Sequence, residues 1–385
     1  MNDRERFKAI MHYQPYDRLP LVHFAHWNET LERWAAEGHL SAEEVRGFGQ
    51  FETDAAIARK LGFDFDYFTC MFPDIYLRPF FTEEILEELP GGGRKVRNIE
   101  GVTVLVHPGA TGIPTEVEHL LKGRKEWEEH YKPRLQFDPE RVNGAMIWVG
   151  DRYVRFDQGG LEYLKRDDRT HHLGLYCGSL FGNLRTIVGL VGVSLMLATD
   201  EDLYDEMIEV NAEMTYRCVK MVLESGARFD FAHFWEDIAC KSGPLVIPSV
   251  FEEKVGPHYR RITDLCHQHG IDIISLDCDG CIDALAPIWL KHGVNTMFPI
   301  EVGTWKASIA PWRAQYGREL RGVGGMDKKV FAYDYAAIDA EVERLRPLVE
   351  LGGFIPCPDH RIAPDAKWEN VQYYCERMLA TFTNR

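Results

Sequence analysis

The sequence contains no long hydrophobic run. None of its apolar stretches reaches the roughly 18 residues that a membrane-spanning helix needs. The first ten residues, MNDRERFKAI, are charged and lack the apolar region of a secretory signal peptide. The sequence therefore predicts a cytoplasmic protein that does not act on or in a membrane.

An excess of positive charge is also missing. The 385 residues include 44 Lys and Arg against 60 Asp and Glu, which gives a net charge of −16. Nucleic-acid phosphates require a basic surface, and a strongly anionic substrate would need a cleft of the opposite sign. The composition thus predicts no nucleic-acid partner and argues against a highly anionic substrate.

A second cysteine pair is absent, and so are the common nucleotide-binding and hydrolase motifs. The nine cysteines are irregularly spaced, and the C-x-x-C of Cys278 and Cys281 has no second pair, so we expect reduced cysteines. The chain has no Walker loop, no H-E-x-x-H and no G-x-S-x-G. These absences argue against a zinc ribbon, a P-loop enzyme, a zincin and an α/β-hydrolase.

What the sequence does have is an alternation of apolar runs with helix-like stretches. Seven such runs, together with LPLVHFAHW (19–27), predict eight parallel strands that are each followed by a helix. The pattern predicts a single α/β domain over 1–385, a TIM (β/α)8 barrel with an N-terminal helical extension. A doubly wound open sheet is the alternative, weakened by the missing G-x-G-x-x-G. The seven runs are MIWVG (146–150), LGLYCGS (173–179), FDFAHFWED (229–237), IDIISLDCDG (271–280), VNTMFPIEV (294–302), ELRGVGGMD (319–327) and GFIPCPDH (353–360).

Residues 75–115 have a different pattern. Short stretches of alternating apolar and polar residues surround the Gly-rich turn PGGG, which predicts strands joined by tight turns. We interpret 75–115 as a β-hairpin insertion near the barrel mouth rather than a separate domain.

Acidic residues follow five successive predicted strands. The active sites of such barrels lie at the carboxyl ends of the strands, so these residues are expected to share one rim. One acidic strand end is ordinarily a helix cap, but five in a row would repel each other unless cations, protons or a metal neutralise them. The catalytic candidates are Glu236, Asp277, Glu301 and Asp327.

The stretch SLDCDGC suggests a metal site. In an extended segment Asp277 and Asp279 point to one face, and His360 follows the last predicted strand. Two carboxylates and one imidazole suit a catalytic divalent metal, with Glu236 as a fourth candidate ligand. The alternative is an acidic polar network with Lys241, Lys328 and Arg361 as counter-ions.

Aromatic residues near the first strand ends predict a pocket wall for a flat substrate. For the histidines of HFAHW, an ordinary core or rim position is the alternative. The predicted substrate-binding residues are His26, Trp27, Phe72, Tyr76, Phe234 and Trp235.

Several segments resemble the uroporphyrinogen decarboxylase superfamily, in order and over nearly the whole chain. They are RERFKAIMHYQPYDRLPL, GPLVIPSVFEEKVGPHYRRI, DCDGCIDALAPIWLKHGVNTMFPIEV and GGFIPCPDHRIAPDAKWENVQYY. The resemblance implies a TIM barrel. It also implies one of two activities, namely cofactor-free decarboxylation of porphyrinogens or zinc-dependent methyl transfer to or from corrinoids.

The resemblance favours the methyltransferase branch of the superfamily. HFAHWNE stands where the decarboxylases carry an arginine-rich segment. Asp277, Asp279 and His360 stand near the His, Cys and Cys zinc ligands of the coenzyme M methyltransferases, which looks like the demethylating subset. The implied activity removes a methyl group from a methoxylated aromatic or another methylated small molecule and passes it to a Co(I) corrinoid on a partner protein, with zinc as Lewis acid. A uroporphyrinogen decarboxylase-like enzyme, other metal-dependent chemistry and a non-catalytic binding barrel are the alternatives. The oligomeric state stays open, with a homodimer as one option.

Overall fold

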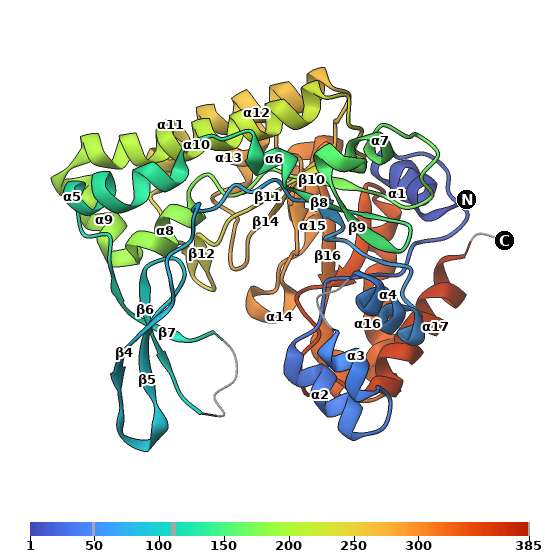
Figure 1. Ribbon diagram of the computed structural model, residues 1–385. Coiled ribbons are helices and arrows are strands. Elements are labelled where there is room, and N and C mark those ends of the chain that lie inside the picture. The colour runs from blue at the N-terminus through green and yellow to red at the C-terminus, as the bar shows by residue number, and fades with distance from the viewer. Residues whose placement is uncertain (48–50, 109–112, 384–385) are drawn as a thin grey trace.

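A parallel barrel forms the body of the molecule (Figure 1). The computed structural model describes residues 1–47, 51–108 and 113–383. The predicted (β/α)8 barrel is confirmed, and β2 and β3 are two short stretches of one extended segment that together fill the second position. The barrel strands are β1 (Val22–His23), β2 (Phe65–Asp66), β3 (Cys70–Met71), β10 (Gly174–Tyr176), β11 (Phe231–Trp235), β14 (Ile274–Asp277), β15 (Thr296–Phe298), β16 (Arg321–Met326) and β17 (Phe354–Pro358).

Hydrogen bonding runs continuously around most of the barrel. Seven strands form a parallel sheet in the order β17-β16-β15-β14-β11-β10-β3, and β1 pairs in parallel with β2. A parallel bridge between His26 and Ile362 joins the chain after β1 to the chain after β17. This bridge closes the barrel on the side where the first and last strands meet.

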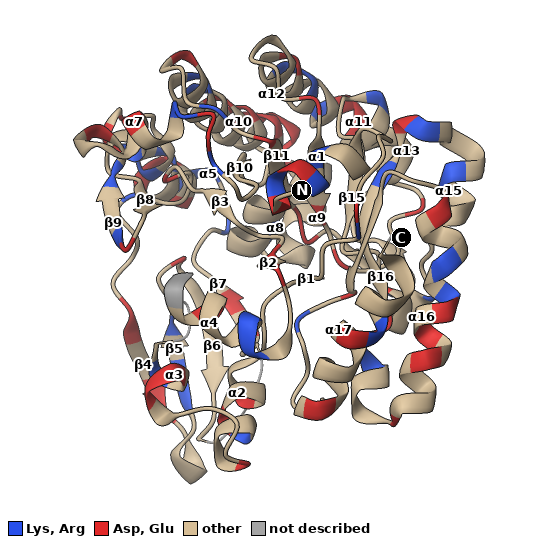
Figure 2. Ribbon diagram, turned by 90° about the vertical axis from the view of Figure 1, so that its right-hand side faces the viewer, with Lys and Arg blue, Asp and Glu red and all other residues tan. Residues whose placement is uncertain are grey.

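Amphipathic helices cover the outside of the barrel. The longest, α10, begins after the cap Asp200 and buries one stripe, which includes Leu203, Met207 and Cys218. Figure 2 shows acidic and basic residues interspersed along outer helices such as α10 and α16. The main helices are α1 (Asp3–Met11), α2 (Asn28–Ala36), α3 (Ala42–Arg46), α4 (Phe51–Leu61), α8 (Gly182–Val188), α9 (Leu190–Thr199), α10 (Glu201–Glu224), α11 (Pro248–Lys254), α12 (Gly256–Gln268), α13 (Ala286–Lys291), α14 (Val302–Trp305), α15 (Ile309–Tyr316), α16 (Tyr335–Glu350) and α17 (Trp368–Phe382).

The prediction of a barrel strand at MIWVG (146–150) is wrong. Residues Met146–Val149 form β8, which pairs in an antiparallel hairpin with β9 (Arg152–Arg155). The turn between them contains Gly150 with φ +70°, a conformation that glycine adopts without strain. The extended segment 65–71 takes the second barrel position instead, and its two short stretches carry too weak a strand pattern to predict.

The insertion is larger than a hairpin. It forms a four-stranded antiparallel sheet in the order β4-β5-β6-β7, and it projects from the same end of the barrel as α14 (Figure 1). Its strands are β4 (Glu84–Glu88), β5 (Arg94–Arg97), β6 (Val102–Val106) and β7 (Thr115–His119).

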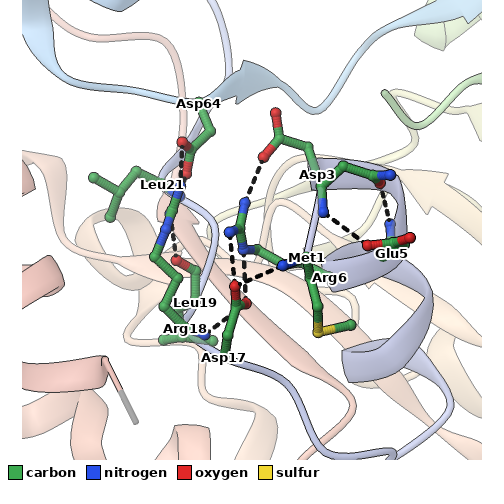
Figure 3. Close-up of polar contacts among 10 residues, drawn as sticks. Met1, Asp3, Glu5, Arg6, Asp17, Arg18, Leu19, Leu21 and Asp64 are labelled. Carbon is green, nitrogen blue, oxygen red and sulfur yellow. Dashed lines mark hydrogen bonds and ion pairs between the residues drawn. The ribbon is translucent and has the colours of Figure 1, made fainter. Parts of the chain in front are cut away.

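Charged contacts fix the N-terminal helical extension to the barrel (Figure 3). Arg6 of α1 makes two hydrogen bonds of 2.8 Å to Asp17, and Arg18 makes bonds of 2.6 and 2.7 Å to Asp64. Asp64 also accepts a bond from the backbone N–H of Leu21, just before β1. Such bidentate pairs hold α1, the start of β1 and the end of α4 together.

Within the described residues, no single helix is long and apolar enough to cross a bilayer. Helices α8 and α9 are long and apolar enough only when they are taken together, and the chain bends by 96° between them. Helix α9 buries Val193 and Met196 while it exposes Val191 and Leu195.

The core contains a histidine whose burial makes stability depend on pH. The ring of His172 lies 4.1 Å from that of Phe65 and 5.7 Å from that of Phe231, and burial lowers its pKa from 6.5 to about 3. An unfolded chain protonates this histidine below its ordinary pKa, whereas the folded chain does not. The stabilisation from neutral His172 is therefore complete above pH 6.5 and is lost as pH falls towards 3.

We predict that the substitution His172→Phe removes this loss of stability at low pH. The free energy of unfolding of the variant relative to wild type should rise by about 1.4 kcal/mol per pH unit below pH 6.5. Urea denaturation at pH 7.5 and 5.5 measures the difference. A constant difference at both pH values would contradict the prediction.

Candidate functional site

The candidate site lies at the barrel mouth, where the carboxyl ends of the strands meet. The insertion sheet and the α2–α3 helices flank this end of the barrel (Figure 1). Asp277 ends β14, and its Cα partners are Trp235 on β11 and Phe298 on β15. Parallel pairing thus sets an acidic side chain between two aromatic neighbours at the rim.

Asp277 is a buried carboxyl group among other carboxylates. It is 5% exposed. Burial, together with the charges of Asp279 and Asp237, raises the pKa of Asp277 well above its usual value, and Arg361 opposes this only in part. The surroundings therefore favour the protonated form of Asp277.

Asp279 and His360 form a pair beside Asp277. The Nε2 of His360 lies 3.2 Å from Oδ2 of Asp279, as their predicted proximity requires. The other carboxylate oxygen of Asp279, Oδ1, is buried and has no hydrogen-bond partner. The His360 ring stacks on Trp27 at 5.8 Å and meets Phe24 edge-on at 5.7 Å. Asp279 thus offers one free oxygen to a ligand in an aromatic setting.

The residues predicted as metal ligands do not fit a metal site. Over 1–47, 51–108 and 113–383, no group of three or more His, Cys, Asp or Glu side chains is placed to hold a metal ion. Of the four predicted ligands, Asp279 and His360 are paired with one another. Glu236 is fully occupied elsewhere. We therefore derive no chemical step that passes through zinc.

Glu236, which is predicted as a ligand and a catalytic group, has both carboxylate oxygens engaged in hydrogen bonds. Glu236 is completely buried, and it accepts hydrogen bonds from the Ser179 hydroxyl and from the backbone N–H groups of 180–182. The Tyr259 hydroxyl also donates to it. Glu236 holds the start of α8 against β11 and α12, which is a structural role.

Glu301 and Asp327 have different roles, because Glu301 lies at the rim and Asp327 caps a helix. Glu301 accepts bonds from the N–H of Gly280 at 2.6 Å and from the hydroxyl of Thr304 at 2.8 Å. Burial and the charge of Asp279 raise the pKa of Glu301. Asp327 accepts from the N–H of Lys329 at 3.0 Å, as an ordinary helix cap does. Glu301 therefore belongs to the rim, and Asp327 caps the start of the 3-10 helix Lys328–Ala332.

Two of the three expected counter-ions lie at the rim. Lys328 lies near Asp359 and Glu301, and burial lowers its pKa. The guanidinium of Arg361 lies 5.3 Å from the Trp27 ring centroid and acts on Asp277. Lys241 is exposed, in the turn that joins β12 (Ala239–Cys240) to β13 (Gly243–Pro244). The predicted alternative of an acidic network with cationic neighbours matches this arrangement.

Aromatic rings line one side of the mouth. The rings of Phe72 and Tyr176 lie 4.9 Å apart, and Phe68 lies 5.8 Å from Phe72. The Tyr76 hydroxyl lies 3.2 Å from that of Tyr176. Of the predicted wall residues, Phe72 and Tyr76 contact Tyr176, Trp27 stacks on His360, and Trp235 is the Cα partner of Asp277.

His26 and Phe234 are not part of this wall, contrary to the prediction. Phe234 is completely buried and its ring lies 5.0 Å from Tyr259 of α12, on the outer face of β11. His26 is buried behind the mouth, where its ring lies 5.6 Å from that of Trp34. Adjacent strand residues face opposite ways, so Trp235 and Phe234 could not both face the mouth.

Sequence reasoning missed the floor of the site. His233 lies in register with Tyr176 and Ser275, and its Nδ1 makes a hydrogen bond with the Ser275 hydroxyl. Its Nε2 is buried without a partner, and burial lowers the pKa of His233 to about 3, so the ring is neutral. Alternation along FAHFW, which places His233 on the face of Trp235, was the signal that could have found it.

The comparisons with known proteins agree with this fold. Residues 169–379 match the family described as uroporphyrinogen decarboxylase (URO-D), which is more than half of the chain. The chain belongs to the uroporphyrinogen decarboxylase family. The comparison with curated proteins gives no match.

Two solved structures are similar in fold. A methyltransferase from Methanosarcina mazei has a TM-score of 0.61 and 13% identity, with 98% of each chain covered. A B12-independent methionine synthase from Shewanella sp. W3-18-1 has a TM-score of 0.47 and 12% identity, with 93% of this chain and 97% of that chain covered. At these identities the first likeness establishes the shared barrel.

We predict that Glu236→Gln destabilises the protein. The amide NH2 of Gln cannot accept a hydrogen bond, so buried N–H groups at 180–182 would lose their acceptor. The free energy of unfolding should fall by about 2–4 kcal/mol in urea denaturation. Glu253→Gln, at an exposed position, is the matched control and should change it by less than about 0.5 kcal/mol. Equal stability of the two variants would contradict the structural role of Glu236.

Proposed function

We propose that the protein is a methyltransferase that removes the methyl group of a methoxylated aromatic or another methylated small molecule. The acceptor is the Co(I) corrinoid of a partner protein. Support comes from family membership, from a barrel shared with the Methanosarcina mazei methyltransferase, and from a mouth that combines aromatic rings with buried carboxyl groups.

The observation that carries the proposal is the environment of Asp277. A methyl ether is inert because negative charge develops on its oxygen as the methyl group leaves. A positioned acid that protonates this oxygen removes that charge. Asp277 is buried beside Asp279, and its pKa is raised well above its usual value. A protonated carboxyl group in the mouth is the acid that this reaction needs.

The corrinoid supplies an electron pair to the methyl carbon, the carbon–oxygen bond breaks, and its electrons stay on the oxygen. That oxygen takes the proton of Asp277 and leaves as an alcohol or a phenol. The rings of Trp27 and Phe72 exclude water from the mouth, which strengthens the electrostatic effect of the site.

Zinc is a separate prediction that this mechanism does not use. The described residues do not gather three ligands for a metal ion, and two of the predicted ligands, Asp279 and His360, lie in contact with each other. Metal analysis of the purified chain tests the prediction directly.

Decarboxylation of a polycarboxylate is less well supported. It requires a basic cleft, for which the candidate cations of the insertion region are Arg78, Arg94, Lys95 and Arg97. Arg94, Lys95 and Arg97 are each paired with a glutamate of the neighbouring strand β4. These cations are therefore neutralised within the insertion sheet.

We predict that Asp277→Asn lowers the rate constant of methyl transfer by about 10²–10³-fold. The assay follows the loss of Co(I) absorbance with a corrinoid protein and a panel of methoxylated aromatics. In wild type the rate should fall as pH rises through the pKa of Asp277, since the acid must be protonated to act. The variant should lack this dependence.

Asp272→Asn is the matched control. Asp272 precedes β14 at the opposite end of the strand and pairs with His12 at 2.9 Å. Its variant should transfer methyl within about twofold of wild type. Absence of transfer from every donor, or full activity of Asp277→Asn, would contradict the proposal.

A further inference from the structure

A second concave region adjoins the mouth. It is a groove of about 630 Å³ between the insertion sheet and the barrel. Ligand-binding clefts of proteins fall within about 300–1,000 Å³, so this one could hold a small molecule. Its walls come from the insertion strands, from α8 and from the end of β11.

The insertion supplies an aliphatic wall. Ile85, Val96 and Val104 are Cα partners on three successive strands, so their side chains share one face of the sheet. Val106 lies on the same face at the end of β6, and all four line the groove. A sheet face of this composition suits an apolar ring.

The barrel supplies one ring and one free donor. Trp235 lines the groove and is the Cα partner of Asp277, so the groove reaches the strand next to the one that carries the proposed acid. Arg185 of α8 forms an ion pair with Asp237, while its Nε–H is buried and has no acceptor. A buried donor without an acceptor is costly, and an oxygen of a ligand would satisfy it.

The charges of the groove disfavour an anionic ligand. Its two arginines are neutralised, Arg94 by Glu88 at 3.2 Å and Arg185 by Asp237. Glu83, Glu100 and Glu116 also line it, and burial together with the charge of Glu116 raises the pKa of Glu100. A carboxylate would enter a region of negative potential close to the acidic rim.

We infer that this groove binds the ring of an uncharged aromatic methyl ether and excludes aromatic carboxylates. The ring lies between the aliphatic face of the sheet and Trp235, and the Nε–H of Arg185 donates to a ligand oxygen. The inference rests on the proposed function, because it identifies which methyl donors reach Asp277.

Binding of veratrole and of its carboxylate analogue veratrate, measured by isothermal titration calorimetry, tests the inference. Wild type should bind veratrole at least about tenfold more tightly than veratrate. This ratio corresponds to about 1.4 kcal/mol of repulsion between the carboxylate of veratrate and the acidic groove. Val106→Glu should weaken veratrole binding by about tenfold or more, because it places a charge in the apolar wall.

Val117→Glu is the matched control. Val117 lies on the neighbouring strand β7 and is not among the described residues that line the groove. Its side chain is similarly exposed, at 47% against 40% for Val106. Its affinity for veratrole should stay within about twofold of wild type. Circular dichroism and the midpoint of thermal unfolding check that both variants are folded.

The possible results separate this inference from the proposed function. Equal effects of the two substitutions, or tighter binding of veratrate than of veratrole, would overturn the inference. Methyl transfer from other donors without any veratrole binding would overturn it as well, while the proposed function stands. Selective veratrole binding that Val106→Glu abolishes would support the groove even if no methyl group were transferred, in which case the proposed function fails.

Discussion

The account depends on one electrostatic constraint, the burial of Asp277 among other carboxylates. Two neighbouring carboxylates and a low-dielectric surrounding make the charged form of Asp277 unfavourable, and Arg361 offsets this only in part. The Nε2 atom of His360 lies 3.2 Å from Oδ2 of Asp279, which of the two acidic neighbours has the larger effect on the pKa of Asp277. These surroundings favour a proton on Asp277, and that proton is what the proposed reaction consumes.

The barrel enforces this constraint through backbone register. Parallel pairing sets Asp277 beside Trp235, and Glu236 fixes the start of α8 next to the same strand end. The turn after Asp279 uses Gly280 with φ +85°, where a Cβ atom would lie 2.7 Å from the backbone nitrogen of Cys240. Only glycine permits that close approach. The carboxylates are thus held by rigid elements rather than by mobile loops.

The sequence predicted most of the barrel because strand and helix periods alternate clearly after residue 170. It also placed Asp277, Asp279 and His360 at one rim, and the structure brings Asp279 and His360 into contact. The sequence did not reveal that the carboxylate oxygens of Glu236 are all hydrogen-bonded. The donors are backbone N–H groups of 180–182 and a hydroxyl of α12, which only tertiary packing brings to Glu236. Phe234 was assigned to the mouth because aromatic content alone does not tell which face of β11 a ring occupies.

Carbon-13 NMR of the aspartate carboxyl groups tests the central claim most directly. The signal of Asp277 is identified by its loss in Asp277→Asn and is followed through a pH titration. The account predicts that this carboxyl group titrates well above the exposed aspartates of the same chain. Titration of Asp277 together with those exposed aspartates would show that it is charged at neutral pH and would contradict its role as the acid.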